Sequence, residues 1–284
     1  MATTPAPVVL PNTPTPDLAR IVCENCWTHF RSWAAWPGIT VHHEPDVTWS
    51  EAPIPHVFFN QVYGARFRYS AAERRIATLK GHAERRGMPL IWRVGPDSTP
   101  GNLPRLLERG GLTYADDGLA MAMDLAQLDL RDPTSSHVVI RDVRDDAALR
   151  LWTEIGIEGF EFPASMAGPV FDMHRAMGLG PDRNHQHFLA GIDGETVGMA
   201  TMTTHCGVVA LQNLATRRAY RRRGVGTALA RHVMREGRKR GFRTGVLQAS
   251  SLGQGLYRAI GFREVGRVFE FVLDAPASGR AGSG

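Results

Sequence analysis

The sequence of 284 residues predicts a mixed α/β (α+β) fold, in which two similar domains each hold a mixed, mostly antiparallel central sheet flanked by helices. Two observations lead to this prediction. After residue 136, apolar residues alternate between the two-residue period of strands and the wider spacing of helices. In the first half, a shorter series of strand, loop, helix and strand has the same order as the end of the chain, which indicates a repeat.

The second half contains the longer series of elements. Asp193-Gly194 is typical of a tight hairpin turn, so the strands on either side of it should pair antiparallel. In chain order we expect a strand at 137–143, helices at 147–160 and 167–177, strands at 187–192, 196–203 and 208–215, a helix at 226–240, a strand at 246–249, a helix at 253–260 and a closing strand at 265–273.

The first half carries the weaker copy of the repeat. A strand at 90–94 and a helix at 103–111 precede a strand at 119–125, and Gly111 in LLERGGL matches Gly261 in LYRAIGF. The stretch RDPTSS is a plausible linker between the copies. We therefore expect a disordered tail at 1–16, a first domain at 17–130, a second domain at 137–274 and a disordered tail at 275–284.

Composition and cysteine content limit which cellular compartment and which cofactors we expect. No apolar run approaches the roughly 18 residues of a membrane span, and the N-terminus has neither the basic start nor the apolar stretch of a secretory signal. Three cysteines are too few for a disulfide framework. Cys23 and Cys26 form a CxxC pair with His29 nearby, but no second ligand pair stands at a matching spacing. We expect a cytoplasmic protein without a metal.

The positive charge is concentrated in one stretch. The net charge is +5, and residues 217–243 hold eleven Lys and Arg against one acid, Glu236. This stretch has only Tyr220 and Phe242 as aromatic residues, too few for a base-stacking platform, and matches no nucleic-acid-binding module. The sequence therefore predicts a small polyphosphate ligand rather than nucleic acid.

A glycine motif lies within this basic stretch. A strand and a short loop lead to Arg221-x-x-Gly224-x-Gly226, which opens a predicted helix. A helix N-terminus offers unpaired N–H groups and a partial positive charge, and glycines let a pyrophosphate come close to both. A Rossmann site needs a third glycine and an acid about 20 residues later, and a P-loop needs Gly-Lys-Ser/Thr. Neither pattern is present here.

This segment resembles the acyl-CoA-binding core of the GNAT family of N-acetyltransferases, whose pattern is (Q/R)-x-x-G-x-(G/A) after a strand. The family also has a later Tyr-x-x-x-Gly-Phe run, and Tyr257, Gly261 and Phe262 stand at that spacing. The match is specific for 208–273, whereas for 137–207 it rests on the order of elements and for 20–127 it is weaker. The chain thus resembles a tandem GNAT protein with a degenerate N-terminal copy.

The resemblance implies a GNAT-type N-acetyltransferase that moves an acetyl or other small acyl group from acyl-CoA to an amine acceptor by direct attack. Acetyl-CoA or another acyl-CoA is the implied co-substrate, with no metal. Tyr257 matches the tyrosine that protonates the departing thiolate. The positions implied to bind the pantetheine arm and the pyrophosphate are Leu214, Ala215, Thr216, Arg221, Arg222, Arg223, Gly224, Val225, Gly226 and Thr227.

The general base has several candidates. Family members often carry Glu on the strand before the motif, but VVALQNLAT offers only Gln212 and Asn213. The remaining candidates are Glu158, Glu161, His205 and the C-terminal end of the third strand, 208–215.

The first copy differs from the second at the implied donor site. It has no Gly-x-Gly around residues 67–86, and Leu107 occupies the tyrosine position. We expect this copy to complete the acceptor pocket rather than to bind a donor.

Two alternatives to this interpretation stay open. An acyl-carrier protein could bring the donor and dock on an arginine face formed by Arg231, Arg235 and Arg238. The protein could also be a non-catalytic acyl-CoA sensor, since the strand glutamate is missing. In the leading hypothesis the partner is a small-molecule or peptide amine, with no nucleic acid and no membrane.

Overall fold

The computed structural model describes residues 8, 13, 15–129, 137–181 and 183–274. The predicted linker and C-terminal tail lie outside this range. Val8 falls within the predicted N-terminal tail, yet its N–H donates to the carbonyl of Gly207 at 3.1 Å and its carbonyl accepts from the Thr244 hydroxyl at 2.7 Å. Among the described helices, none is both long and apolar enough to cross a bilayer.

The chain folds into two compact units that do not follow its two halves. Unit 1 contains residues 1–36 and 119–266, and unit 2 contains residues 37–118 and 267–284. Strands β5 (Thr113–Asp124) and β11 (Arg263–Leu273) each begin in one unit and end in the other.

Unit 1 has a mixed sheet in the order β5-β10-β9-β8-β7-β6. Pairs β6–β7, β7–β8, β8–β9 and β10–β5 are antiparallel, while β9–β10 is parallel. The prediction of a mixed, mostly antiparallel sheet is confirmed. The elements of this unit are α1 (Thr15–Ser32), β6 (Val139–Asp142), α4 (Asp146–Gly159), α5 (Ala167–Met177), β7 (His185–Ile192), β8 (Glu195–His205), β9 (Val208–Thr216), α6 (Val225–Lys239), β10 (Thr244–Ala249) and α7 (Gln254–Ile260).

Helix α6 covers one face of this sheet at very close range. A Cβ atom on Gly237 would lie 2.4 Å from Val209 Cγ1, and one on Gly198 would lie 2.5 Å from Val225 Cγ1. Both glycines are therefore required by packing rather than by backbone conformation. The apolar residues of α6 join the buried core formed with β7 to β10.

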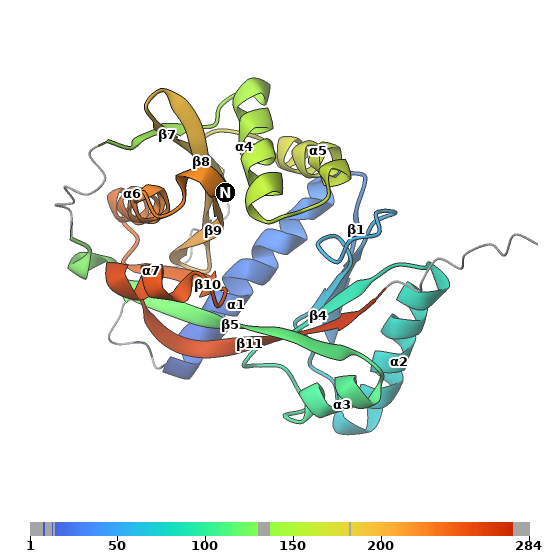
Figure 1. Ribbon diagram of the computed structural model, residues 1–284. Coiled ribbons are helices and arrows are strands. Elements are labelled where there is room, and N and C mark those ends of the chain that lie inside the picture. Colours follow the sequence, from blue (N-terminus) through green and yellow to red (C-terminus); the bar gives the residue numbers. More distant parts are fainter. Residues whose placement is uncertain (1–7, 9–12, 14, 130–136, 182, 275–284) are drawn as a thin grey trace, which may run out of the picture. The chain divides into compact units, whose positions relative to one another are not determined.

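Helices α1, α4 and α5 lie on the other face (Figure 1). Helix α1 comes from the first half of the sequence, yet its Asn25 is fully buried in unit 1. The Asn25 amide donates to the carbonyl of His205 at 3.0 Å and accepts from the Thr203 hydroxyl at 2.9 Å. Because losing either partner would leave a buried polar group unsatisfied, α1 is an integral part of this unit.

Unit 2 has the strand order β1-β2-β3-β4-β11. Its core includes Trp92 and Leu107, both fully buried, together with Phe271 from β11. Its other elements are β1 (Thr40–Glu44), β2 (Val47–Glu51), β3 (Gln61–Tyr63), α2 (Tyr69–Arg85), β4 (Leu90–Val94) and α3 (Leu103–Arg109).

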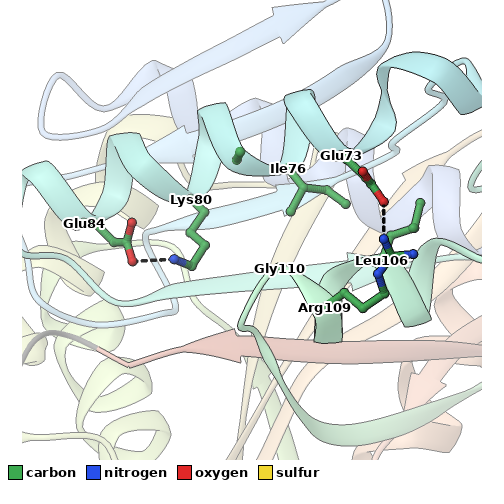
Figure 2. A pocket seen from close by; sticks show the side chains of 8 residues that line it. Glu73, Ile76, Lys80, Glu84, Leu106, Arg109 and Gly110 are labelled. Atoms are coloured by element: carbon green, nitrogen blue, oxygen red, sulfur yellow. Dashed lines mark hydrogen bonds and ion pairs between the residues drawn. The ribbon is translucent and has the colours of Figure 1, made fainter.

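A surface hollow in unit 2 lies between α2 and α3 (Figure 2). Two ion pairs line it, Lys80 with Glu84 at 2.6 Å and Arg109 with Glu73 at 2.7 Å. Its charges are therefore paired within the protein. No glycine-rich turn like that before α6 precedes α2, which begins after Arg68 in an extended conformation.

The closing strands are exchanged between the sequence repeats. Residues 119–124 of β5 pair with β10, and residues 269–273 of β11 pair with β4. Each unit is thus completed by the last strand of the other repeat. The predicted domains 17–130 and 137–274 follow the sequence repeat and stay a prediction. The two compact units differ from them, because each unit combines residues from both repeats.

This exchange predicts that the second repeat is incomplete by itself. A chain of residues 137–284 lacks β5 and α1, so β10 becomes an edge strand and the face that buries Leu18 and Val22 is exposed. We expect this chain to show no cooperative urea transition by circular dichroism, whereas the full chain shows one. A cooperative transition in 137–284 at the midpoint of the full chain would contradict this.

Candidate functional site

The sheet of unit 1 splits between β9 and β10. Their parallel ladder covers only Val209–Leu211 opposite Gly245–Leu247, although β9 continues to Thr216. On its other side β9 stays paired with β8 as far as Thr216. The N–H and C=O groups of the last residues of β9 that face β10 therefore line an opening inside the sheet.

A bulge shapes this opening. Asn213 has a left-handed φ of 47°, and the β8–β9 register shifts between Met199 and Thr201. A bulge bends the strand and increases its twist. Residues 212–214 are only partly buried, in contrast to the fully buried residues that precede them on β9.

Helix α6 begins at the end of this opening. Gly224 is its N-cap with a φ of 82°, a left-handed conformation that favours glycine. A Cβ atom on Gly226 would lie 3.1 Å from Leu256 Cδ1 and 3.7 Å from Leu214 Cδ2, which places the first turn of the helix against β9 and α7. The first N–H groups of α6 have no partner within the helix and carry the positive end of its dipole.

The arginines of the loop have different surroundings. The Arg221 guanidinium donates to the carbonyls of Thr216 at 3.4 Å and Gly159 at 3.2 Å, so it connects the loop to the ends of β9 and α4. The Arg223 guanidinium lies 3.3 Å from the Asp193 carboxylate and 5.2 Å from the centre of the Tyr220 ring. Arg222 is exposed and has a left-handed φ of 64°.

Tyr257 lies on α7, which packs on α6. Its side chain is 8% exposed, and its ring lies 6.0 Å from that of Phe262, centre to centre. Burial raises the pKa of the phenol to about 12. At neutral pH this group is therefore protonated and able to donate a proton.

Two of the three base candidates are held by other groups. Glu158 accepts from Arg217 at 2.6 Å and from the backbone N–H of Arg218 at 3.1 Å. Glu161 lies 3.3 Å from the Arg218 guanidinium. The third, His205, has a pKa lowered by burial to about 4.

Sequence reasoning missed a group of buried histidines on the face of α4 and α5. His174 and His187 are each 1% exposed, and their rings lie 4.8 Å apart, centre to centre. The alternation in HQHFLAGI could have indicated His185 and His187 on one face of a strand. In the described part of the chain, no three side chains of His, Cys, Asp or Glu are placed to hold a metal ion.

The comparisons with known proteins agree with this geometry. Residues 183–264, which contain the split strand, the loop and Tyr257, match the model of the acetyltransferase (GNAT) domain. The chain carries a GNAT acetyltransferase domain. No curated protein matches the chain.

Solved structures share the fold over most of the chain. A GCN5-related N-acetyltransferase from Kribbella flavida covers 89% of this chain and 95% of its own, with 15% identity and a TM-score of 0.68. One from Sphaerobacter thermophilus covers 95% of each chain, with 19% identity and a TM-score of 0.63.

A tandem GNAT protein from the clavulanic acid biosynthesis pathway is similar as well. It covers 96% of this chain and 98% of its own, at 15% identity and a TM-score of 0.58. At these identities the likeness concerns the fold. The predicted GNAT-type acetyltransferase is confirmed by the family model, and the predicted fold class by these structures.

Proposed function

We propose that unit 1 transfers an acetyl or other small acyl group from acyl-CoA to an amine by direct attack on the thioester. The observation that carries this proposal is the split between β9 and β10, which ends at the N-terminus of α6. An extended chain with amide groups can pair with the free edge of β9, while an anion at its end meets the helix.

The pantetheine arm suits the free edge of β9, and the pyrophosphate suits the N-terminus of α6. In this proposal, the backbone of 214–216 pairs with the arm in the manner of an added strand. The N–H groups of Val225, Gly226 and Thr227 bind the pyrophosphate, and the exposed Arg222 and its neighbour Arg223 add charge. Arg221 supports the loop through the carbonyls it contacts.

Tyr257 supplies the proton for the leaving group. When the amine attacks and the C–S bond breaks, the thiolate of CoA needs a proton, and a buried neutral phenol can donate one. Leu256, the residue before Tyr257, lies against Gly226 in the first turn of α6, which supports placing α7 beside the donor site.

The surface beside the opening favours a cationic acceptor. A hollow of ≈ 430 Å³ is lined by carboxylates of Glu154, Glu158 and Glu161 and by apolar side chains that include Phe162. Gly159, in the same segment, packs against Ala215 on β9. Because Glu158 and Glu161 are paired with Arg217 and Arg218, Glu154 is the carboxylate of this lining that an amine with an apolar portion would meet.

Docking of an acyl-carrier protein on α6 has less support than free acyl-CoA. Arg231 and Arg235 are half-buried, and only Arg238 of the expected arginine face is exposed. A docking surface for an acidic carrier needs accessible cations.

A sensor without catalysis differs from an acyltransferase in one observable result: it releases no free thiol from acetyl-CoA when amines are supplied.

The donor loop gives the first test of this proposal. Gly224→Glu places a carboxylate where the pyrophosphate binds, so we expect the Kd of acetyl-CoA in calorimetric titration to rise about 10-fold or more, because like charges repel at the helix N-terminus. Gly241→Glu is the matched control. Gly241 also has a left-handed φ, 89°, it follows the other end of α6, and a Cβ atom at this position would have no neighbouring atom within 4 Å. Equal Kd values in the two variants would overturn the loop assignment.

The phenol gives the second test. Tyr257→Phe should lower kcat for acyl transfer by about 10²-fold with little change in the KM of acetyl-CoA, because only leaving-group protonation is lost. Tyr114→Phe is the control, since Tyr114 lies in unit 2 and donates to Asp117. Thiol release measured across a panel of primary amines decides the result. An unchanged kcat in Tyr257→Phe would remove the acid role.

A further inference from the structure

Glu158, in the last turn of α4, makes two contacts with the segment that joins β9 to α6. We call this segment, residues 217–223, the β9–α6 loop. One carboxylate oxygen of Glu158 accepts from the Arg217 guanidinium at 2.6 Å, and the other accepts from the backbone N–H of Arg218 at 3.1 Å. Both oxygens therefore bond to the start of this loop, although Glu158 itself belongs to the helix that lines the proposed acceptor hollow.

The bond to the Arg218 N–H caps a helix. Arg218 begins a short 3₁₀ helix, Arg218–Tyr220, and the N-cap residue Arg217 makes no side-chain capping bond. The first N–H groups of a helix have no partner within it, and a carboxylate is a strong acceptor for them. Glu158 thus caps this helix from a different element, which connects the beginning of the β9–α6 loop to α4.

Arg217 extends this attachment to β8. Its backbone N–H donates to the carbonyl of Val197 at 2.9 Å, and its guanidinium donates to the carbonyl of Thr196 at 3.3 Å. The side chains of Arg217 and Glu158 are 31% and 39% exposed, so water weakens the attraction between their charges. The ion pair alone would contribute little, and the bond to the Arg218 N–H carries most of the attachment to α4.

The last turn of α4 also packs directly on the end of β9. A Cβ atom on Gly159 would lie 2.6 Å from Ala215 Cβ, so helix and strand are in close contact. The Gly159 carbonyl accepts from the Arg221 guanidinium, in the β9–α6 loop, at 3.2 Å. Glu158 therefore lies on a segment that is packed against residues 214–216, the proposed site of the pantetheine arm.

The other side of the β9–α6 loop has a separate attachment. The Tyr220 hydroxyl donates to the Glu195 carboxylate at 2.5 Å, and the Arg223 guanidinium lies 3.3 Å from the Asp193 carboxylate. These contacts are with the turn between β7 and β8 and are exposed to solvent. Removal of the Glu158 carboxylate would release the start of the loop but not its middle, so we expect a partial rather than a complete loss of donor binding.

We propose that Glu158 is a positioning residue for the acyl donor, because it holds the β9–α6 loop in the conformation that leads from the edge of β9 to the first turn of α6. The inference rests on the proposed acyl transfer. Glu158 acts indirectly, through the Arg218 N–H and the Arg217 guanidinium. Glu154, one turn earlier on α4, lines the same hollow and is the carboxylate proposed to meet the acceptor. The two carboxylates of α4 thus serve different substrates.

The test is the Kd of acetyl-CoA in Glu158→Gln and Glu158→Ala, measured by calorimetric titration of the full chain. A loop that is in position for only part of the time binds with a Kd raised in proportion. Glutamine keeps an oxygen for the Arg218 N–H but loses the charge, so we expect the Kd to rise about 3-fold. Alanine loses both contacts, so we expect a rise of about 10-fold or more. In turnover, the loss should appear in the KM of acetyl-CoA and not in kcat.

Asp146→Asn is the matched control. Asp146 lies in the first turn of α4 and pairs with Arg175 at 2.8 Å, so this variant removes an ion pair from the same helix away from the loop. Its Kd should equal that of the wild type, and the Arg218 amide should exchange hydrogen faster in Glu158→Ala but not in Asp146→Asn. A wild-type Kd in Glu158→Ala, or an equal rise in Asp146→Asn, overturns the positioning role. If the wild-type protein binds acetyl-CoA but acylates no amine, the proposed acyl transfer fails while these Kd values still decide the role of Glu158.

Discussion

The short ladder between β9 and β10 is the constraint on which the rest of the site depends. Only three residues of each strand pair before the two separate, and the bulge at Asn213 turns β9 away from its neighbour. A strand edge inside a sheet normally carries a cost, because its N–H and C=O groups lose their partners. Here the opening ends at the N-terminus of α6, where a second set of N–H groups is free. The same chain geometry thus prepares two kinds of hydrogen-bonding groups for one extended, anionic ligand.

The two repeats exchange secondary-structure elements, so that each compact unit contains elements of both. Unit 1 takes β5 and α1 from the first repeat, and unit 2 takes the end of β11 from the second. That the degenerate copy completes the acceptor pocket stays a prediction, and the parts of that copy found in unit 1 are α1 and residues 119–124 of β5. Its residues Asn25 and His29 lie on the face of α4 and α5, with Asn25 bonded to Thr203. The first repeat therefore contributes buried polar groups to the face of the unit 1 sheet that α4 and α5 also cover.

Local patterns predicted the elements of the second half well, but they left α1, α2 and β1 to β3 of the first half unassigned and did not predict long-range pairing. The helix 167–177 and the strand 90–94 are observed at the predicted residues, because periodicity and flanking turns are local properties. The exchange of β5 and β11 was not predictable, since both strands have an apolar pattern that suits either neighbour. Gly224 and Gly226 were indicated by their motif; Gly224 has a left-handed φ, and a Cβ atom on Gly226 would lie 3.1 Å from Leu256 Cδ1. The buried histidines were missed because His174 and His187 belong to different elements and meet only through packing.

The most direct test of the donor site is hydrogen exchange of the full chain with and without saturating acetyl-CoA. If the pantetheine arm pairs with β9 and the pyrophosphate binds the first turn of α6, exchange should slow at amides 213–216 and 225–227 together. Amides at the start of α2 in unit 2 should keep their rates. Slower exchange confined to unit 2, or saturating binding that leaves 213–216 unprotected, would contradict the account.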